Sequence, residues 1–262
     1  MKRIDLNCDM GELPEVIADG TQEALLASFT SVNVACGGHA GDASTMQTTI
    51  EQALRHKVAV GAHPGYPDRA NFGRIELNLS AEEVSAFVFE QVRAFGEIAS
   101  CCGASVVHVK PHGALYNQAV HNRGLAEAIA KGVAKWSQNV ILVGLAGSPM
   151  LDVFRDAGFA VAAEAFADRR YEPDGTLRSR KFDDALLRDP QEAARQALSI
   201  AERGVVTAST GVEVAVSAQT LCIHGDTPGA TKIAATVAET LRQAGVQLSP
   251  LSRKEIEPNN ES

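Results

Sequence analysis

Short apolar runs alternate with helical patterns from one end of this 262-residue chain to the other. Most of these runs are rich in β-branched residues and lack the apolar–polar alternation of a strand with one face in water. A repeated strand–helix order predicts an α/β protein with a parallel sheet and right-handed crossovers. The predicted strands are Ile4–Asn7, Ser31–Ala35, Val58–Ala62, Val106–Lys110, Val140–Gly144, Val161–Ala165, Val205–Val206 and Thr220–His224.

The predicted helices begin with recognisable capping residues. Ser80 and Glu83 have the spacing of a capping box, at the start of a helix that should run to Gly103. Asp189 followed by Pro190 is typical of an N-cap with proline at the first helical position. A closed barrel and an open doubly wound sheet both fit this element order. We favour a parallel β/α barrel, because polar motifs follow nearly every strand rather than one switch point.

The chain shows no internal repeat, low-complexity segment or interdomain linker, so we expect residues 1–248 to form a single β/α-barrel domain. The polar stretch from residue 249 to residue 262 is expected to be a disordered C-terminal tail. A long charged segment, Phe166–Arg188, has turn signals only at Pro173, Asp174 and Gly175. A loop of this length is usually functional or mobile.

The formal net charge of −8 argues against nucleic acid or an anionic membrane as the main partner, since both require clustered basic residues. The five cysteines are odd in number and have no CxxC spacing, which indicates reduced thiols in the cytoplasm. The N-terminal segment has a basic start without an apolar run behind it, so we do not expect it to be a signal peptide. No segment is apolar over a membrane-spanning length. A small anionic substrate held by local donors remains compatible with this charge.

Polar side chains gather directly after the predicted strands, in turns rich in glycine. His39, His63 and His112 each lie in a turn bounded by glycine or proline at a strand end, which favours a role in a site. His56 and His121 fit a surface role, and His108 fits a buried core histidine. In a parallel barrel these turns share one rim, so we expect the strand-end residues to surround one pocket and to indicate an enzyme.

Asp9 and Glu12 flank a glycine in the turn after the first strand, where helix capping explains them poorly. Asp42 and Asp226 lie where aspartate often serves as an N-cap. Mixed carboxylates and imidazoles could bind a divalent metal, with Asp9, His39 and His63 as its ligands. The chain lacks the HxH and HExxH spacings of strong metal motifs, so we expect no tightly bound metal.

The turn before the last long helix predicts an anion site. Gly225, Asp226, Thr227 and Gly229 would direct backbone N–H groups from the positive end of that helix towards phosphate. A well-capped crossover is the alternative, and the spacing is not that of a P-loop. The basic pairs Arg169–Arg170 and Arg178/Arg180 could close over an anionic substrate or form a solvated loop.

Six motifs in order make the chain similar to the LamB/YcsF family across nearly its whole length. They are DLNCDMGE, NVACGGHAGD, GAHPGYPD with NFGR, VKPHGALYN, EAFADRRY with DGTLRSR, and CIHGDTPGA. The resemblance implies a seven-stranded barrel of the glycoside hydrolase/deacetylase kind, one strand fewer than the runs counted above. The arginine pair usual in the family after NFG reads Arg74–Ile75 here, which puts a role for the second arginine in doubt.

The resemblance also implies an activity. Family members are the A subunit of ATP-dependent 5-oxoprolinase, which with subunits B and C cleaves 5-oxoproline to L-glutamate, using ATP with Mg as its counter-ion. A stand-alone metal-dependent amide hydrolase or deacetylase, and a non-catalytic scaffold subunit, are the alternatives. The expected catalytic residues are Asp9, His39, His63, Lys110 and His112. The expected substrate-binding residues are Asn7, Glu12, Asn33, Arg74, Tyr116, Asn117, Arg169 and Arg170.

Overall fold

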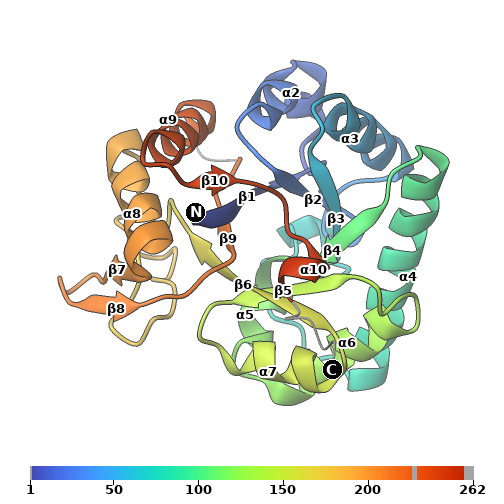
Figure 1. Ribbon diagram of the computed structural model, residues 1–262. Coiled ribbons are helices and arrows are strands. Elements are labelled where there is room, and N and C mark those ends of the chain that lie inside the picture. The colour runs from blue at the N-terminus through green and yellow to red at the C-terminus, as the bar shows by residue number, and fades with distance from the viewer. Residues whose placement is uncertain (1, 226–228, 257–262) are drawn as a thin grey trace, which may run out of the picture.

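The computed structural model describes residues 2–225 and 229–256, and in these ranges seven parallel strands close into a barrel (Figure 1). Each strand pairs in parallel with the next, and the last pairs with both β6 and β1. The prediction of a seven-stranded parallel β/α barrel is therefore confirmed. The barrel strands are β1 (Arg3–Met10), β2 (Ser31–Ala35), β3 (Ala59–His63), β4 (Val106–Val109), β5 (Ile141–Leu145), β6 (Ala160–Phe166) and β9 (Thr220–Cys222).

Helices surround the barrel, one after each strand (Figure 1). The capping predictions are confirmed, because Ser80 and Glu83 form the reciprocal capping box and the Asp189 side chain accepts a hydrogen bond from the Gln191 N–H. The helices of the outer ring are α2 (Thr21–Leu26), α3 (Ala43–Arg55), α4 (Ala81–Cys101), α6 (Arg123–Ala134), α7 (Pro149–Asp156), α8 (Pro190–Arg203) and α9 (Ala230–Gln243). Short elements lie between them: α1 (Pro14–Ala18), η1 (Arg69–Asn71) and α5 (Gly113–Ala119).

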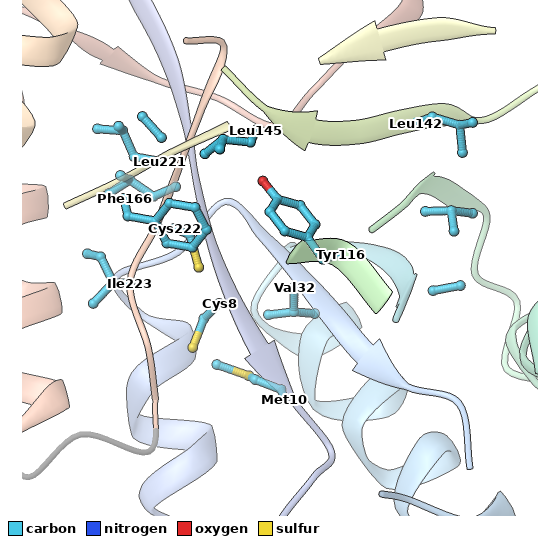
Figure 2. Packing of buried hydrophobic residues seen from close by; sticks show 14 of the residues in the cluster. Cys8, Met10, Val32, Tyr116, Leu142, Leu145, Phe166, Leu221, Cys222 and Ile223 are labelled. Carbon is cyan, nitrogen blue, oxygen red and sulfur yellow. The ribbon is translucent and has the colours of Figure 1, made fainter. Parts of the chain in front are cut away.

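The apolar core lies between the strands and these helices. Strand β1 alternates polar and apolar residues, and its apolar members Leu6, Cys8 and Met10 are fully or almost fully buried. Figure 2 shows Cys8 and Met10 within the same packed region as Cys222 of β9. The polar side chains that lie between these apolar residues in β1 point to the opposite face of the strand, into the barrel.

The barrel interior is polar, which explains the alternation along β1. Asn33 of β2 donates to Asn7 of the neighbouring strand β1 (2.8 Å), and Asn7 donates to Glu164 of β6 (3.1 Å), a strand that does not pair with β1. Gly61 leaves room for His108, because a Cβ at residue 61 would lie 2.2 Å from His108 Nε2. These contacts fix the side chains that support the rim of the barrel.

Two predictions about the chain's periphery hold only in part. Val205–Val206 does form a strand, but β7 (Val205–Thr207) pairs antiparallel with β8 (Glu213–Ala215) outside the barrel. β10 (Gln247–Leu248) pairs with β1, and residues 249–256 of the predicted tail include the helix α10 (Arg253–Ile256). Residues 257–262 lie outside the described residues.

Residues 249–256 cover the amino-terminal end of the barrel. Leu251 is buried against Ile141, Val143, Ala160 and Ala162. Ala160, Ala162 and Glu164 occupy every second position of β6, so their side chains lie on the same face of the strand. Because Glu164 points into the barrel, the two alanines face the interior as well. Leu251 therefore closes the interior from the end opposite the strand-end turns, and its burial outweighs the polar composition that suggested disorder.

Asp5 provides a pH-dependent probe of the polar interior. Burial raises the pKa of Asp5 to about 6, against hydrogen bonds from Thr220, Thr30 and Ser31 that favour the carboxylate. The folded state therefore binds a proton more tightly than the unfolded chain, and this group's contribution to stability is lost as the pH rises from about 4 to about 6.

We expect Asp5→Asn to remove this dependence, because the neighbouring hydroxyls can accept as well as donate. Between pH 7 and pH 4 the free energy of unfolding of the wild type should rise relative to Asp5→Asn by about 2 kcal/mol. Denaturant unfolding of both proteins at several pH values measures the difference. A difference that stays constant with pH would show that Asp5 does not titrate in this range.

None of the helices in residues 2–225 and 229–256 combines the length and the apolar character that a membrane span requires.

Candidate active site

The carboxyl ends of β1, β3 and β4 bring the predicted catalytic residues together. Lys110 Nζ lies 3.0 Å from Asp9 Oδ1, and His63 Nε2 lies 3.2 Å from Asp9 Oδ2. His112 Nδ1 lies 3.0 Å from His63 Nε2. Residues 49 to 101 positions apart in the sequence thus meet at one rim, as the barrel prediction required. Their catalytic roles stay predictions.

Lys110 is the buried cation at the centre of this group. Its ammonium contacts Glu164 at 2.9 Å as well as Asp9, and only 4% of its side chain is exposed. Burial opposes the charge of Lys110, but Asp9 and Glu164 outweigh it and raise its pKa well above the usual value. Burial also opposes the charge of Asp9, whereas His63 and Lys110 hold its pKa well below the usual value. The site therefore carries a fixed ammonium–carboxylate pair.

Three histidines and Glu12 form a second group beside this pair. The rings of His39 and His112 are stacked, with centroids 3.6 Å apart and planes 4° apart. The ring of His63 stands nearly perpendicular to His112, at 87°. Glu12 Oε1 lies 3.0 Å from His39 Nε2 and 3.3 Å from His112 Nδ1. We call Glu12, His39, His63 and His112 the histidine cluster.

Burial keeps two of these histidines neutral. Burial and then the charge of His63 lower the pKa of His39 to about 2, and burial with the charges of His63 and His39 lowers the pKa of His112 to about 3. Gly65 and Gly73 permit this packing, because a Cβ at either position would lie within 2.7 Å of a His39 atom. The imidazoles therefore offer lone pairs near pH 7.

The substrate-binding predictions divide into three groups. Arg74, Tyr116, Asn117 and Arg169 line a cavity of about 870 Å³ together with Glu12. Asn7 and Asn33 lie deeper, where Asn33 donates to Asp9 Oδ1 at 2.8 Å, so they support the site from below.

Arg170 does not line the cavity; its guanidinium pairs with Glu192 (3.1 Å) and Asp184 (3.9 Å). Arg178 likewise pairs with Glu172 and Asp184, each at 2.7 Å. Arg180 and Lys181 of the same loop do line the cavity. Ile75, which replaces the family's second arginine, is 49% exposed and does not line it.

The predicted anion site is described only in part. Gly225 lines the cavity. Gly229 is the N-cap of α9, with φ 82° in the left-handed region that glycine tolerates. Asp226 and Thr227 lie outside the described residues. Phosphate binding by this turn stays a prediction.

Two acidic residues that bear on the site were absent from the predicted set. Glu164, which holds Lys110, is the one charged residue within the apolar β6 strand, and a charge at a buried strand position could have revealed it. Asp168 contacts His224 Nδ1 at 3.0 Å, and His224 lines the cavity. No local sequence pattern joins this second pair. His108 is a core histidine as predicted, with Nε2 2.6 Å from Asn33 Oδ1.

Fold and site together define a seven-stranded parallel β/α barrel with a rim rich in histidine and carboxylate. A family 4 carbohydrate esterase from Streptomyces lividans shares this fold, with a TM-score of 0.52 at 11% identity over 97% of this chain and 95% of that chain. Within this class, the chain belongs to the LamB/YcsF family, whose model matches residues 4–256.

Two relatives are much more similar. The A subunit of 5-oxoprolinase from Chloroflexus aggregans is 48% identical over 94% of this chain and 98% of its own length. The crystal structure of a lactam utilization protein from Thermus thermophilus has a TM-score of 0.89 and 42% identity, over 95% of this chain and all of that chain.

Proposed function

We propose that this chain is the A subunit of an ATP-dependent 5-oxoprolinase. With subunits B and C it would cleave 5-oxo-L-proline to L-glutamate, coupled to ATP hydrolysis. The observation that carries the proposal is the 48% identity to the A subunit of a 5-oxoprolinase over 94% of this chain. The same motifs that carry this similarity supply the side chains around the cavity.

The charge around the cavity suits the substrate. 5-Oxoproline carries one carboxylate, and Arg169, Arg180 and Lys181 line the cavity on the side of the long loop. Small-molecule sites commonly occupy about 300–1,000 Å³. A cavity of about 870 Å³ therefore has room for the lactam and for part of a second ligand, such as the phosphates of ATP with its Mg. The nucleotide would bind here, on a partner subunit, or between them.

The rim residues match the demands of the reaction. A five-membered lactam is a resonance-stabilised amide, so water attacks its carbonyl carbon slowly. Transfer of the γ-phosphoryl group of ATP to the amide oxygen would create a better electrophile. Asp9 or His112 would accept the proton of the attacking water, and the nitrogen would take a proton as its bond to carbon breaks. A second water would then hydrolyse the resulting acyl phosphate to glutamate and inorganic phosphate. Lys110 would stabilise the negative charge that develops on oxygen.

Release of glutamate from 5-oxoproline tests the proposal. The chain would be assayed alone and mixed with its candidate B and C partners, with and without ATP and Mg. We expect glutamate only in the complete mixture with ATP. No release in any mixture of folded, associated subunits would contradict the proposal.

A second candidate is a metal-dependent amide hydrolase that acts without partners. The histidine cluster favours it, because Glu12, His39, His63 and His112 offer ligand atoms within 4.8 Å of one another. This candidate predicts ATP-independent hydrolysis of an N-acyl sugar or a simple amide by the chain alone. Its independence of ATP and of partners separates it from the oxoprolinase reaction, which requires both.

A further inference from the structure

In the histidine cluster, one ring nitrogen of His63 and one of His112 point their lone pairs at each other. His63 Nδ1 lies 2.7 Å from the carbonyl oxygen of Lys110, and His112 Nε2 lies 2.9 Å from that of Phe72. Because a carbonyl oxygen only accepts, both of these nitrogens carry a hydrogen, which in a neutral imidazole is the only one. The opposite nitrogens, His63 Nε2 and His112 Nδ1, are then unprotonated, yet they lie 3.0 Å apart. Two lone pairs at this distance repel unless a cation joins them.

Two carboxylates approach the same point. Asp9 Oδ2 lies 3.2 Å from His63 Nε2, and Glu12 Oε1 lies 3.3 Å from His112 Nδ1 and 4.0 Å from His63 Nε2. Four ligands bound about 2.1 Å from a tetrahedral metal lie about 3.4 Å from one another. The four separations given above, 3.0, 3.2, 3.3 and 4.0 Å, surround this value. We propose that His63, His112, Asp9 and Glu12 bind one divalent transition-metal ion.

The surroundings of these ligands resemble the outer shell of a metal centre. Metal-binding histidines usually donate their other ring N–H to a carbonyl or carboxylate, as His63 and His112 do here. One ammonium, Lys110, is shared by Asp9 and Glu164, so it neutralises only one of these two carboxylates. A dication would balance the negative charge that remains. Both observations are independent of the spacing of the ligand atoms.

His39 belongs to the cluster but fits a positioning role rather than a ligand role. A metal lies near the plane of an imidazole that binds it, and the stacked rings of His39 and His112 have centroids 3.6 Å apart. Two parallel planes at that separation cannot both contain the ion. His39 Nε2 instead donates to Glu12 Oε1 at 3.0 Å and orients this carboxylate. Its Nδ1 has no hydrogen-bond partner in residues 2–225 and 229–256.

Two imidazoles and two carboxylates suit Zn²⁺, Mn²⁺ or Fe²⁺. Bound there, such an ion would polarise an amide oxygen or a water molecule at the rim. This role rests on the proposed function, whereas the site itself rests on the side chains. The ligand set also differs from the Asp9, His39 and His63 set considered from the sequence, because Glu12 and His112 join it and His39 leaves it.

Calorimetric titration of the chelator-treated full chain with ZnCl₂ and MnCl₂ tests the site. We expect one equivalent per chain, and a thermal midpoint that rises with the bound metal. His63→Gln and His112→Gln should each weaken zinc affinity at least about 100-fold, because each removes a ligand. His39→Asn should weaken it about 10- to 100-fold, as the loss of an orienting partner does. His121→Gln removes a cavity-lining histidine outside the cluster and should bind zinc as the wild type does.

Absence of stoichiometric metal from the folded chain would overturn the proposal, as would unchanged affinity in both His63→Gln and His112→Gln. The pair would then share a proton instead. Should the histidine variants fail to fold, Glu12→Gln removes a ligand charge at a partly exposed position and should also lose affinity at least about 10-fold. Bound metal without glutamate release in the complete mixture would contradict the proposed function and leave the site standing.

Discussion

Replacing Lys110 by methionine should lower the free energy of unfolding by about 3–5 kcal/mol and abolish glutamate release. The ammonium lies 2.9 Å from Glu164 and 3.0 Å from Asp9, so its loss leaves two carboxylates without their shared cation. Breaking a buried ion pair on one side costs about this much, because the remaining charge is neither solvated nor paired. Denaturant unfolding measures the first effect, and the ATP-dependent assay with partners measures the second.

A double variant separates stability from catalysis. Lys110→Met combined with Glu164→Gln removes one of the two stranded charges and should recover at least half of the lost stability, with no recovery of turnover. Lys131→Met, on the exposed side of α6, is the matched control and should change the unfolding free energy by less than about 0.5 kcal/mol. Wild-type turnover by the double variant would remove Lys110 from the mechanism.

Asp9→Asn should lower turnover by about 10²–10⁴-fold and leave the fold intact. The substitution is isosteric, and the local contacts accommodate an amide. Its oxygen can accept from Asn33 and Lys110, as Asp9 Oδ1 does now. In the metal-free chain its nitrogen can donate to His63 Nε2, which carries a lone pair in the neutral ring because His63 Nδ1 donates to the Lys110 carbonyl. The loss of the charged base is then the main change, and general acid–base groups contribute about this factor.

The measurement pairs glutamate release with denaturant unfolding, and the unfolding free energy should change by less than about 1 kcal/mol. Asp42→Asn is the matched control. Asp42 caps α3 in a capping box, and asparagine caps as well as aspartate, so this variant should keep both activity and stability. Turnover of Asp9→Asn equal to that of the wild type would exclude Asp9 as the base.

The order of strands and the location of the site followed from local patterns. Buried β-branched runs and capping residues such as Ser80 and Asp189 depend on neighbouring residues only, so they are readable in sequence. Parallel strands place their carboxyl ends on one edge, which is why Asp9, His63 and Lys110 could be predicted to meet. The number of barrel strands could not be derived in this way. Val205–Val206 has the composition of a strand, and this composition does not distinguish a strand of the barrel from one that pairs outside it.

Other features depended on contacts between distant residues. Glu164 and Lys110 are 54 positions apart, and only barrel closure makes them a pair. Arg169 and Arg170 are adjacent with the same side chain, yet Arg169 lines the cavity and Arg170 binds Glu192, because successive residues point in different directions. Leu251 is ordered because it packs against an apolar surface at the open end of the barrel, and the polar sequence around Leu251 does not predict this contact.

The sequence by itself therefore determined the α/β class, the family and the residue types at the rim, since each depends on the order of side chains along the chain. The tertiary structure decided the direction in which each side chain points and the hydrogen on each imidazole. The backbone carbonyls of Lys110 and Phe72 orient His63 and His112 so that their lone pairs converge. No spacing in the sequence encodes that convergence, because it depends on strands that meet only when the barrel closes.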